Sequence, residues 1–156
     1  MREIFWLRPD RIAGRAGPGL YSWIPAELAA GGIGAILSVN DGASVYPDDL
    51  AAAGIDYACY PMEDNAPPRP GDFEHCVATL PPALEFVTGR LDSGRSVLIH
   101  CTAGKDRTGL TMCHYLCRRE GYQPEQAIVE VRRVRPQALS APGYEPFALE
   151  VLRALG

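Results

Sequence analysis

The segment His100–Gly109, with the sequence HCTAGKDRTG, places a cysteine and an arginine in one short glycine-containing loop. The apolar run Val97–Ile99 directly precedes this loop and predicts a buried strand, while Leu110–Glu120 follows it and predicts a helix. A strand, a tight loop and a helix in this order direct backbone N–H groups and a helix N-terminus toward one small volume. Such a volume binds an anion of phosphate size, so this segment constrains both the fold and the chemistry.

The residue types in the loop suit attack by sulfur on phosphorus. We expect the positive field of the loop to favour the thiolate of Cys101, which would act as the nucleophile and form a phosphocysteine intermediate. Arg107 is expected to grip two phosphate oxygens with its planar guanidinium, and the amides of residues 102–107 to bind the others. A nucleotide-binding Walker loop is excluded, because Asp106 rather than Ser or Thr follows Lys105.

Two further side chains complete the predicted chemistry. His100 is expected to hold the loop from the end of the strand and not to act as a base. The leaving oxygen needs a proton, so a carboxylic acid must face the loop. Asp64 is the candidate, because it lies in the proline-rich stretch Pro61–Pro70 directly after a predicted strand. Glu63 is the neighbouring alternative, for which we expect a solvated surface role.

The alternation of apolar runs and helical stretches predicts one α/β domain over residues 1–156, with a central, mostly parallel sheet of four to five strands flanked by helices. Strands are predicted at Arg11–Ala13, Ala35–Val39, Ile55–Tyr60 and Ser96–Ile99, and helices at Pro25–Ala30, Asp48–Ala53, Phe73–Val87, Leu110–Glu120, Pro124–Arg135 and Tyr144–Leu155.

Three local features refine this outline. Ile55–Tyr60 has apolar residues on both sides, which predicts a central strand. Pro81 and Pro82 predict a break in the helix that contains them. Gly14–Gly19 predicts a loop, in which Arg15 is expected to be a surface charge or to line the mouth of the pocket.

Composition limits the partners and the compartment. The net charge of −4 disfavours nucleic acid and anionic membranes as partners, and no apolar run is long enough to span a bilayer. The odd number of irregularly spaced cysteines predicts reduced thiols and a cytoplasmic protein, with Cys59, Cys113 and Cys117 expected as small core residues. We expect a monomer that needs no metal and no cofactor.

The loop and two other segments resemble the cysteine-dependent phosphatases with a Cys-x5-Arg loop, specifically their atypical dual-specificity and tensin-like branch. Tyr60–Pro68 resembles the general-acid loop of that branch, and Ala127–Pro136 resembles its penultimate helix. The resemblance implies that Asp64 takes the position of the acid. It also implies that the Thr108 hydroxyl donates to the thiolate, although a helix cap is an equal alternative for Thr108. The predicted substrate-binding residues are therefore Thr102, Ala103, Gly104, Lys105, Asp106 and Thr108.

The substrate prediction has two branches. The first is a phosphoprotein carrying phosphotyrosine, or also phosphoserine and phosphothreonine. The second is an inositol phosphate or phosphoinositide, because Lys105 resembles the loop lysine of phosphoinositide phosphatases. Two departures weigh against this second branch, since tensin-like lipid enzymes usually carry lysine where Thr102 stands and histidine where Asn65 stands.

Other roles remain open for the charged residues near the loop. Lys105 and Asp106 are expected to select the substrate or to form a solvated pair at the rim. The cluster of Arg132, Arg133 and Arg135 is expected to guide anions or to form a solvated helix end. A phosphate-binding module without catalysis is the alternative from another functional class, and the presence of Cys101, Arg107 and an acid argues against it.

Overall fold

The computed structural model describes residues 3–156, so Met1 and Arg2 of the predicted domain lie outside the described residues. Within this range the strands form one sheet in the order β1-β2-β5-β3-β4. Their bounds are β1 Phe5–Arg8, β2 Ile12–Ala16, β3 Ile33–Ser38, β4 Asp56–Cys59 and β5 Ser96–Cys101. The β1–β2 pair is antiparallel and the other pairs are parallel. The predicted single α/β domain with a mostly parallel sheet is therefore confirmed.

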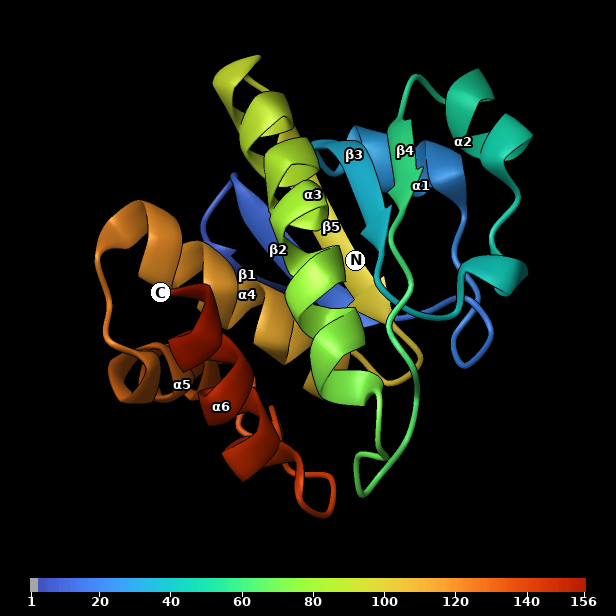
Figure 1. Ribbon diagram of the computed structural model, residues 1–156. Helices are drawn as coiled ribbons and strands as arrows, with labels where there is room; N and C mark the ends of the chain where they lie inside the picture. Colours follow the sequence, from blue (N-terminus) through green and yellow to red (C-terminus); the bar gives the residue numbers. More distant parts are fainter. Residues whose placement is uncertain (1–2) are drawn as a thin grey trace.

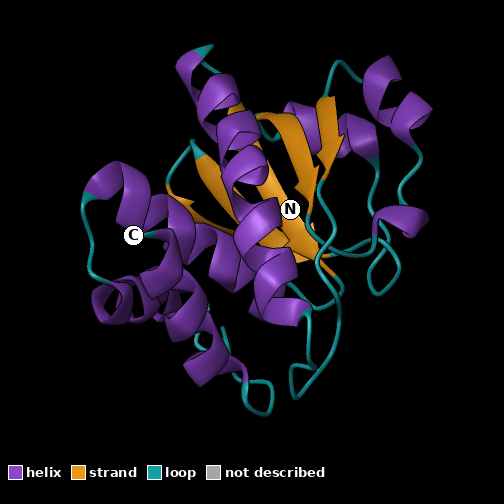
Figure 2. Ribbon diagram, viewed as in Figure 1, coloured by secondary structure: helices purple, strands orange, loops and turns teal. Residues whose placement is uncertain are grey.

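Helices cover both faces of the sheet, as Figures 1 and 2 show. Helices α3, α4, α5 and α6 lie on one face, and α1 and α2 lie on the other. Their bounds are α1 Pro25–Ala30, α2 Pro47–Ala52, α3 Asp72–Asp92, α4 Asp106–Glu120, α5 Pro124–Val134 and α6 Tyr144–Leu155, and a 3-10 turn η1 spans Gly42–Ser44. The larger apolar core lies under α3–α6, and a smaller one lies under α1 and α2.

Two strand predictions are corrected by the structure. Ile55–Tyr60 does not form a central strand, because β4 is the last strand of the sheet and its residues are only partly buried or exposed. Gly14 belongs to β2 and not to a loop. A Cβ atom at this position would lie 2.4 Å from the ring of Phe5. Glycine is needed at this position for packing under β1, an antiparallel strand that the sequence analysis missed.

The helix with two internal prolines is also corrected. Pro81 and Pro82 lie inside α3, which continues without a break from Asp72 to Asp92 (Figure 1). Each proline removes a backbone N–H donor and crowds the carbonyl four residues earlier, which normally ends a helix. Here the buried positions lie on both sides of the prolines, from Cys76 to Leu91. Packing of this continuous apolar face against the sheet therefore outweighs the local cost.

The arrangement of strands places the predicted loop at the centre of the sheet edge. β5 lies between β2 and β3, and all three run parallel, so their carboxyl ends meet at one edge. Loops that follow parallel strands converge at that edge and build binding sites there. The loop after β5 therefore has the segments that follow β2 and β3 as its neighbours.

Candidate active site

The loop Thr102–Lys105 joins β5 to α4, and α4 begins at Asp106, earlier than the predicted start at Leu110. Arg107 therefore lies in the first helical turn, where backbone N–H groups have no partner within the helix. Gly104 has a φ of 68°, and a Cβ atom there would lie 2.5 Å from the carbonyl carbon of Arg15. Only glycine allows the loop to turn this closely against β2.

Cys101 is buried at the end of β5, with 3 % of its surface exposed. The Thr108 hydroxyl donates a hydrogen bond to its Sγ atom at 3.1 Å. Because Lys105 occupies the position that caps α4, the alternative role of Thr108 as a helix cap is wrong. A hydroxyl donor and a helix N-terminus beside one sulfur are the two features that stabilise a thiolate.

His100 is fully buried behind the loop, and burial lowers its pKa to about 4, so its ring is neutral at pH 7. Its Nδ1 atom lies 3.2 Å from the carbonyl oxygen of Cys101, which only accepts hydrogen bonds, so Nδ1 carries the proton. Nε2 then accepts from the Ser38 hydroxyl at 2.5 Å, and the Tyr57 hydroxyl lies 2.7 Å from that of Ser38. The network fits the predicted supporting role, because both ring nitrogens of His100 have partners other than the Cys101 sulfur.

Arg107 is buried, and its guanidinium is held by the segment predicted to carry the acid. Its Nε and Nη2 atoms donate to the carbonyl oxygens of Glu63 and Asn65, both at 2.8 Å. Its Nη1 atom forms an ion pair with Asp64 at 2.8 Å. The ring of Tyr144 packs against the guanidinium, with its centroid 4.7 Å from Cζ. These contacts bring the proline-rich loop and the phosphate loop together through a single side chain.

The two candidate acids differ in what they offer to the loop. The carboxylate of Asp64 is directed to Arg107 and keeps 56 % of its side chain exposed, so it is both held in place and open to solvent. Glu63 meets Arg107 through its backbone carbonyl, and the residue is exposed. The geometry therefore favours Asp64 as the group beside the phosphate position.

Two residues outside the predicted set connect these segments. The Asn40 side chain donates to the carbonyl of Met62 at 2.7 Å and accepts from the Thr102 hydroxyl at 2.9 Å, so it joins the acid loop to the phosphate loop. Asn40 lies two residues after the end of β3, and its position at the carboxyl edge beside β5 could have identified it. Tyr144 lies at the start of α6, far along the chain, and no local signal pointed to it.

Lys105 and Asp106 do not form the predicted solvated pair at the rim. Asp106 is buried, and its carboxylate accepts from the backbone N–H of Ala141 at 3.2 Å and lies 3.8 Å from Arg107. The Lys105 ammonium donates to the Ser140 hydroxyl at 3.2 Å. Asp106 thus faces the segment before α6, because a buried carboxylate needs donors that the rim does not supply.

The arginines at the end of α5 and directly after it have partners within the protein. Arg135 donates to the carbonyl oxygens of Ala103 and Gly104 at 2.9 and 3.1 Å. This contact satisfies two carbonyl oxygens of the phosphate loop and ties the loop to the end of α5. Arg132 pairs with Glu145 at 2.6 Å, and Arg133 pairs with Glu130 at 2.7 Å. Arg132 and Arg135 therefore brace the fold, whereas Arg133, with 63 % of its side chain exposed in the last turn of α5, fits the predicted solvated helix end.

The cysteines other than Cys101 occupy different environments. All five cysteines are free thiols. Cys113 is buried and Cys117 is partly buried, while Cys59 is exposed and does not belong to the core as predicted. Cys76 is a buried residue of α3, and burial raises its pKa to about 11. Cys101 thus differs from the buried Cys113 and Cys76 in having a hydroxyl donor on its sulfur.

Comparison with known proteins identifies the family of this site. Residues 20–146 match the family "Dual specificity phosphatase, catalytic domain". The chain is 28 % identical over 160 residues to dual specificity protein phosphatase 12 of Rattus norvegicus, which covers 95 % of this chain and 44 % of that protein. It is 24 % identical over 123 residues to phosphatidylglycerophosphate phosphatase PTPMT2 of Arabidopsis thaliana, covering 78 % of this chain and 52 % of that protein. The chain thus spans about half the length of these curated relatives, or less.

Solved structures show the same fold. The active form of Tk-PTP superposes with a TM-score of 0.79 and 24 % identity, covering 99 % of this chain and 96 % of that one. PTPMT1 in complex with PI(5)P superposes with a TM-score of 0.77 and 16 % identity, covering 98 % of this chain and 96 % of that one. At these identities the structural likeness establishes the architecture around the loop.

Proposed function

The chain belongs to the dual specificity phosphatase family, and we propose that it hydrolyses phosphotyrosine, and also phosphoserine and phosphothreonine, in proteins. The observation that carries the proposal is the group formed by Cys101, Arg107, Thr108 and Asp64. A buried thiol with a hydroxyl donor, a buried guanidinium and an exposed carboxylate meet at one helix N-terminus. This set supplies a nucleophile, a binding group for phosphate and an acid.

In the first step the Cys101 thiolate attacks phosphorus, so that an S–P bond forms while the bond from phosphorus to the substrate oxygen breaks. Asp64 donates its proton to that leaving oxygen. Three of the five N–H groups of Arg107 are committed to the acid loop, which leaves two for phosphate oxygens. We expect a phosphate bound to these two donors to lie beside Asp64, which pairs with the same guanidinium.

In the second step water attacks the phosphocysteine. Asp64, now ionised, accepts a proton from that water while the S–P bond breaks and inorganic phosphate forms. The Thr108 hydroxyl stabilises the departing thiolate through the hydrogen bond that it already makes at 3.1 Å. His100 takes no proton in either step, because its Nδ1–H donates to the Cys101 carbonyl and its Nε2 atom accepts from Ser38.

An inositol phosphate or phosphoinositide is the second candidate substrate. Asp106 is turned toward Ala141, which removes one negative charge from the rim, and the Lys105 ammonium lies beside Ser140 at the edge of the site. One curated relative is named a phosphatidylglycerophosphate phosphatase. We rank this candidate below the phosphoprotein, because Thr102 binds Asn40 and adds no positive charge to the loop.

The remaining proposals concern the setting of the enzyme. No helix among residues 3–156 is long and apolar enough to cross a membrane. We place the activity in the cytoplasm, because a catalytic thiolate needs a reducing compartment to stay active. We further propose that residues 1–156 act as one catalytic unit and as a monomer, with a phosphorylated molecule and not nucleic acid as the partner.

Substitution of the nucleophile tests the proposed chemistry. The Cys101→Ser variant is expected to lose turnover on a phosphotyrosine peptide by more than about 10³-fold, because serine cannot supply a thiolate. It should still bind vanadate, since the amides and Arg107 are unchanged. Cys59→Ser is the matched control, because Cys59 is an exposed thiol. Residual hydrolysis above about one per cent of the wild-type rate in Cys101→Ser would contradict the covalent mechanism.

A further inference from the structure

A second buried arginine lies beside the loop, on the face of the sheet that α1 and α2 cover. Arg15 in β2 pairs with His100 in β5 and keeps only 4 % of its surface exposed. The sequence analysis expected a surface charge or a pocket-mouth residue in a glycine loop; the structure places the side chain inside. Its Nη2 atom donates to the carbonyl of Tyr21 at 2.5 Å, and its Cζ atom lies 5.3 Å from the ring centroid of Trp23.

Arg15 lacks the partners that a buried cation normally has. Its Nε atom is buried with no hydrogen-bond partner among residues 3–156. Within the same range no carboxylate forms an ion pair with it. Burial lowers the pKa of Arg15, and the charge of Glu3 raises it without offsetting the effect of burial. Buried guanidinium groups are stable where anionic or carbonyl oxygens surround them, so the surroundings of Arg15 are incomplete.

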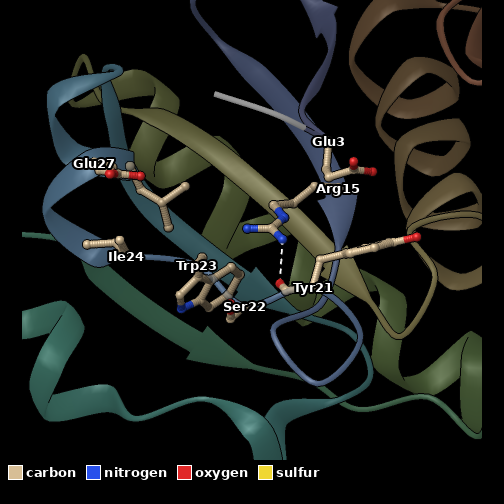
Figure 3. A pocket seen from close by; sticks show the side chains of 8 residues that line it. Glu3, Arg15, Tyr21, Ser22, Trp23, Ile24 and Glu27 are labelled. Carbon is tan, nitrogen blue, oxygen red and sulfur yellow. Dashed lines mark hydrogen bonds between the residues drawn. The ribbon is translucent and has the colours of Figure 1, made fainter.

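The guanidinium points into a pocket of about 420 Å³ (Figure 3). Trp23, Ile24 and Leu28 give this pocket an apolar wall. Glu3 and Glu27 also line the pocket, and both are exposed. Its volume lies within the range of pockets that hold small molecules. The pocket thus combines one buried cation, a flat apolar wall and two negative charges at the rim.

We propose that this pocket binds a small monoanionic carboxylate with a flat apolar body. A carboxylate matches the planar guanidinium of Arg15 and would accept from its Nη1 atom, which makes no hydrogen bond among residues 3–156. The apolar body would pack on Trp23, whose indole already stacks near the cation. A phosphate dianion is disfavoured, because Glu3 and Glu27 add two like charges to the entrance.

The pocket is distinct from the catalytic loop, but its residue Trp23 contacts His100, which holds that loop. The Trp23 ring meets the edge of His100, with centroids 5.2 Å apart, and His100 holds the carbonyl of Cys101. The backbone of Arg15 lies against Gly104 of the loop. A carboxylate bound here would contact the residues that brace the loop without entering the phosphate position. The site therefore goes beyond the proposed phosphatase activity and does not depend on it.

Titration of benzoate into the full chain tests the proposal. The chain has two tryptophans, so the Trp6→Phe variant makes fluorescence report on Trp23 alone. We expect benzoate to change this fluorescence saturably, with a dissociation constant on the order of 1 mM for so small a ligand. Benzamide, a neutral molecule of the same shape, should bind at least tenfold more weakly, and benzoate should still bind when vanadate is in excess.

Two substitutions locate the binding. Arg15→Lys should weaken benzoate at least tenfold, because a point charge cannot replace the planar fork. If that variant does not fold, Glu27→Gln serves instead and should tighten benzoate about twofold by removing a rim charge, whereas Glu74→Gln on α3 should not. Equal binding of benzamide and benzoate, displacement of benzoate by vanadate, or no saturable change up to about 50 mM benzoate would each overturn the proposal.

Discussion

Arg107 and Arg15 are both buried at the carboxyl edge of the same sheet, yet their surroundings differ. Arg107 meets two carbonyl oxygens, a carboxylate and the ring of Tyr144. Arg15 meets one carbonyl and one indole, and its Nε atom has no partner among residues 3–156. The difference shows that burial alone does not define the role of an arginine.

The surroundings indicate what each arginine can do. Apart from Asp106 in its own helix, the partners of Arg107 belong to the acid loop or to α6, so we expect the guanidinium to link the phosphate position to Asp64. Arg15 forms no ion pair among residues 3–156, and its guanidinium lines a pocket. We therefore expect the two residues to respond very differently to the same substitution.

Replacing each arginine with lysine gives the largest expected contrast. Arg107→Lys should lower kcat/KM for p-nitrophenyl phosphate by about 10³-fold or more, because transition-state charge on phosphate loses its bidentate donor. Arg15→Lys should lower it by less than about tenfold, since this residue acts only on the support of the loop. Steady-state kinetics of the two purified variants, with circular dichroism to confirm folding, provide the measurement. Losses of equal size would remove the distinction between the two sites.

Substitution of Asp64, the carboxylate that pairs with Arg107, tests whether this residue is the acid. Asp64→Asn should lower kcat by roughly 10²–10³-fold on a phosphotyrosine peptide, whose leaving group needs a proton. The loss on an aryl phosphate with an acidic phenol should be much smaller. Glu63→Gln is the matched control, because Glu63 holds Arg107 through its backbone carbonyl. If both substrates lose the same factor with Asp64→Asn, the carboxylate positions Arg107 and does not donate a proton.

His100 pairs with Arg15 in the sheet, and its protonation predicts a pH-dependent stability. Burial lowers the pKa of His100, and also that of His114, from 6.5 to about 4. Between these values the unfolded chain binds more protons than the folded one, so the free energy of unfolding falls as the pH falls. The loss is about 2 kcal/mol for each histidine between pH 7 and pH 5.

Urea unfolding at pH 7 and pH 5 measures this loss. The His100→Gln variant, whatever its stability at pH 7, should lose about 2 kcal/mol less than the wild type between the two pH values. His114→Gln on α4 should show a similar reduction, which makes it a control for burial without contact to the loop. An unchanged pH dependence in both variants would mean that neither ring is kept neutral by the fold.

Local sequence patterns predicted most of the fold, and tertiary contacts explain the errors. Tyr144–Leu155 and Pro25–Ala30 form helices with the predicted bounds, because proline, glycine and apolar spacing mark them locally. The continuous helix through Pro81 could not be predicted, since packing against the sheet outweighs the local preference. The strand at Gly14 was missed for the same reason, because the need for glycine arises from Phe5 in a neighbouring strand.

The site residues also divide into those that local spacing predicted and those that only the fold brings together. Cys101, Arg107 and Thr108 lie within one loop, so their spacing already indicated that they would meet. Asp64 followed from its place after a strand and from the family resemblance. Asn40, Tyr144 and Arg135 reach the site from distant segments, and only the fold brings them there. Their roles depend on sheet order and helix packing, which no local spacing encodes.

The smallest expected effect concerns Lys105, and it separates the two candidate substrates. The Lys105 ammonium is held by Ser140, while Asp106 is bound to Ala141 and does not hold it at the loop. If the substrate is a phosphoprotein, Lys105→Ala should raise KM by less than about threefold for both a phosphotyrosine peptide and an inositol polyphosphate, because only general attraction is lost.

If a multiply phosphorylated inositol is the substrate, the same change should raise its KM by about tenfold or more, the size expected for one charged hydrogen bond, and leave the peptide unchanged. Ser140→Ala is the control, because it frees the ammonium without removing it. We expect the uniform, small change, since Thr102 is bound to Asn40 and no second cation joins Lys105 in the segment Thr102–Asp106. A selective loss on the inositol polyphosphate would instead show that Lys105 leaves Ser140 to bind a second phosphate.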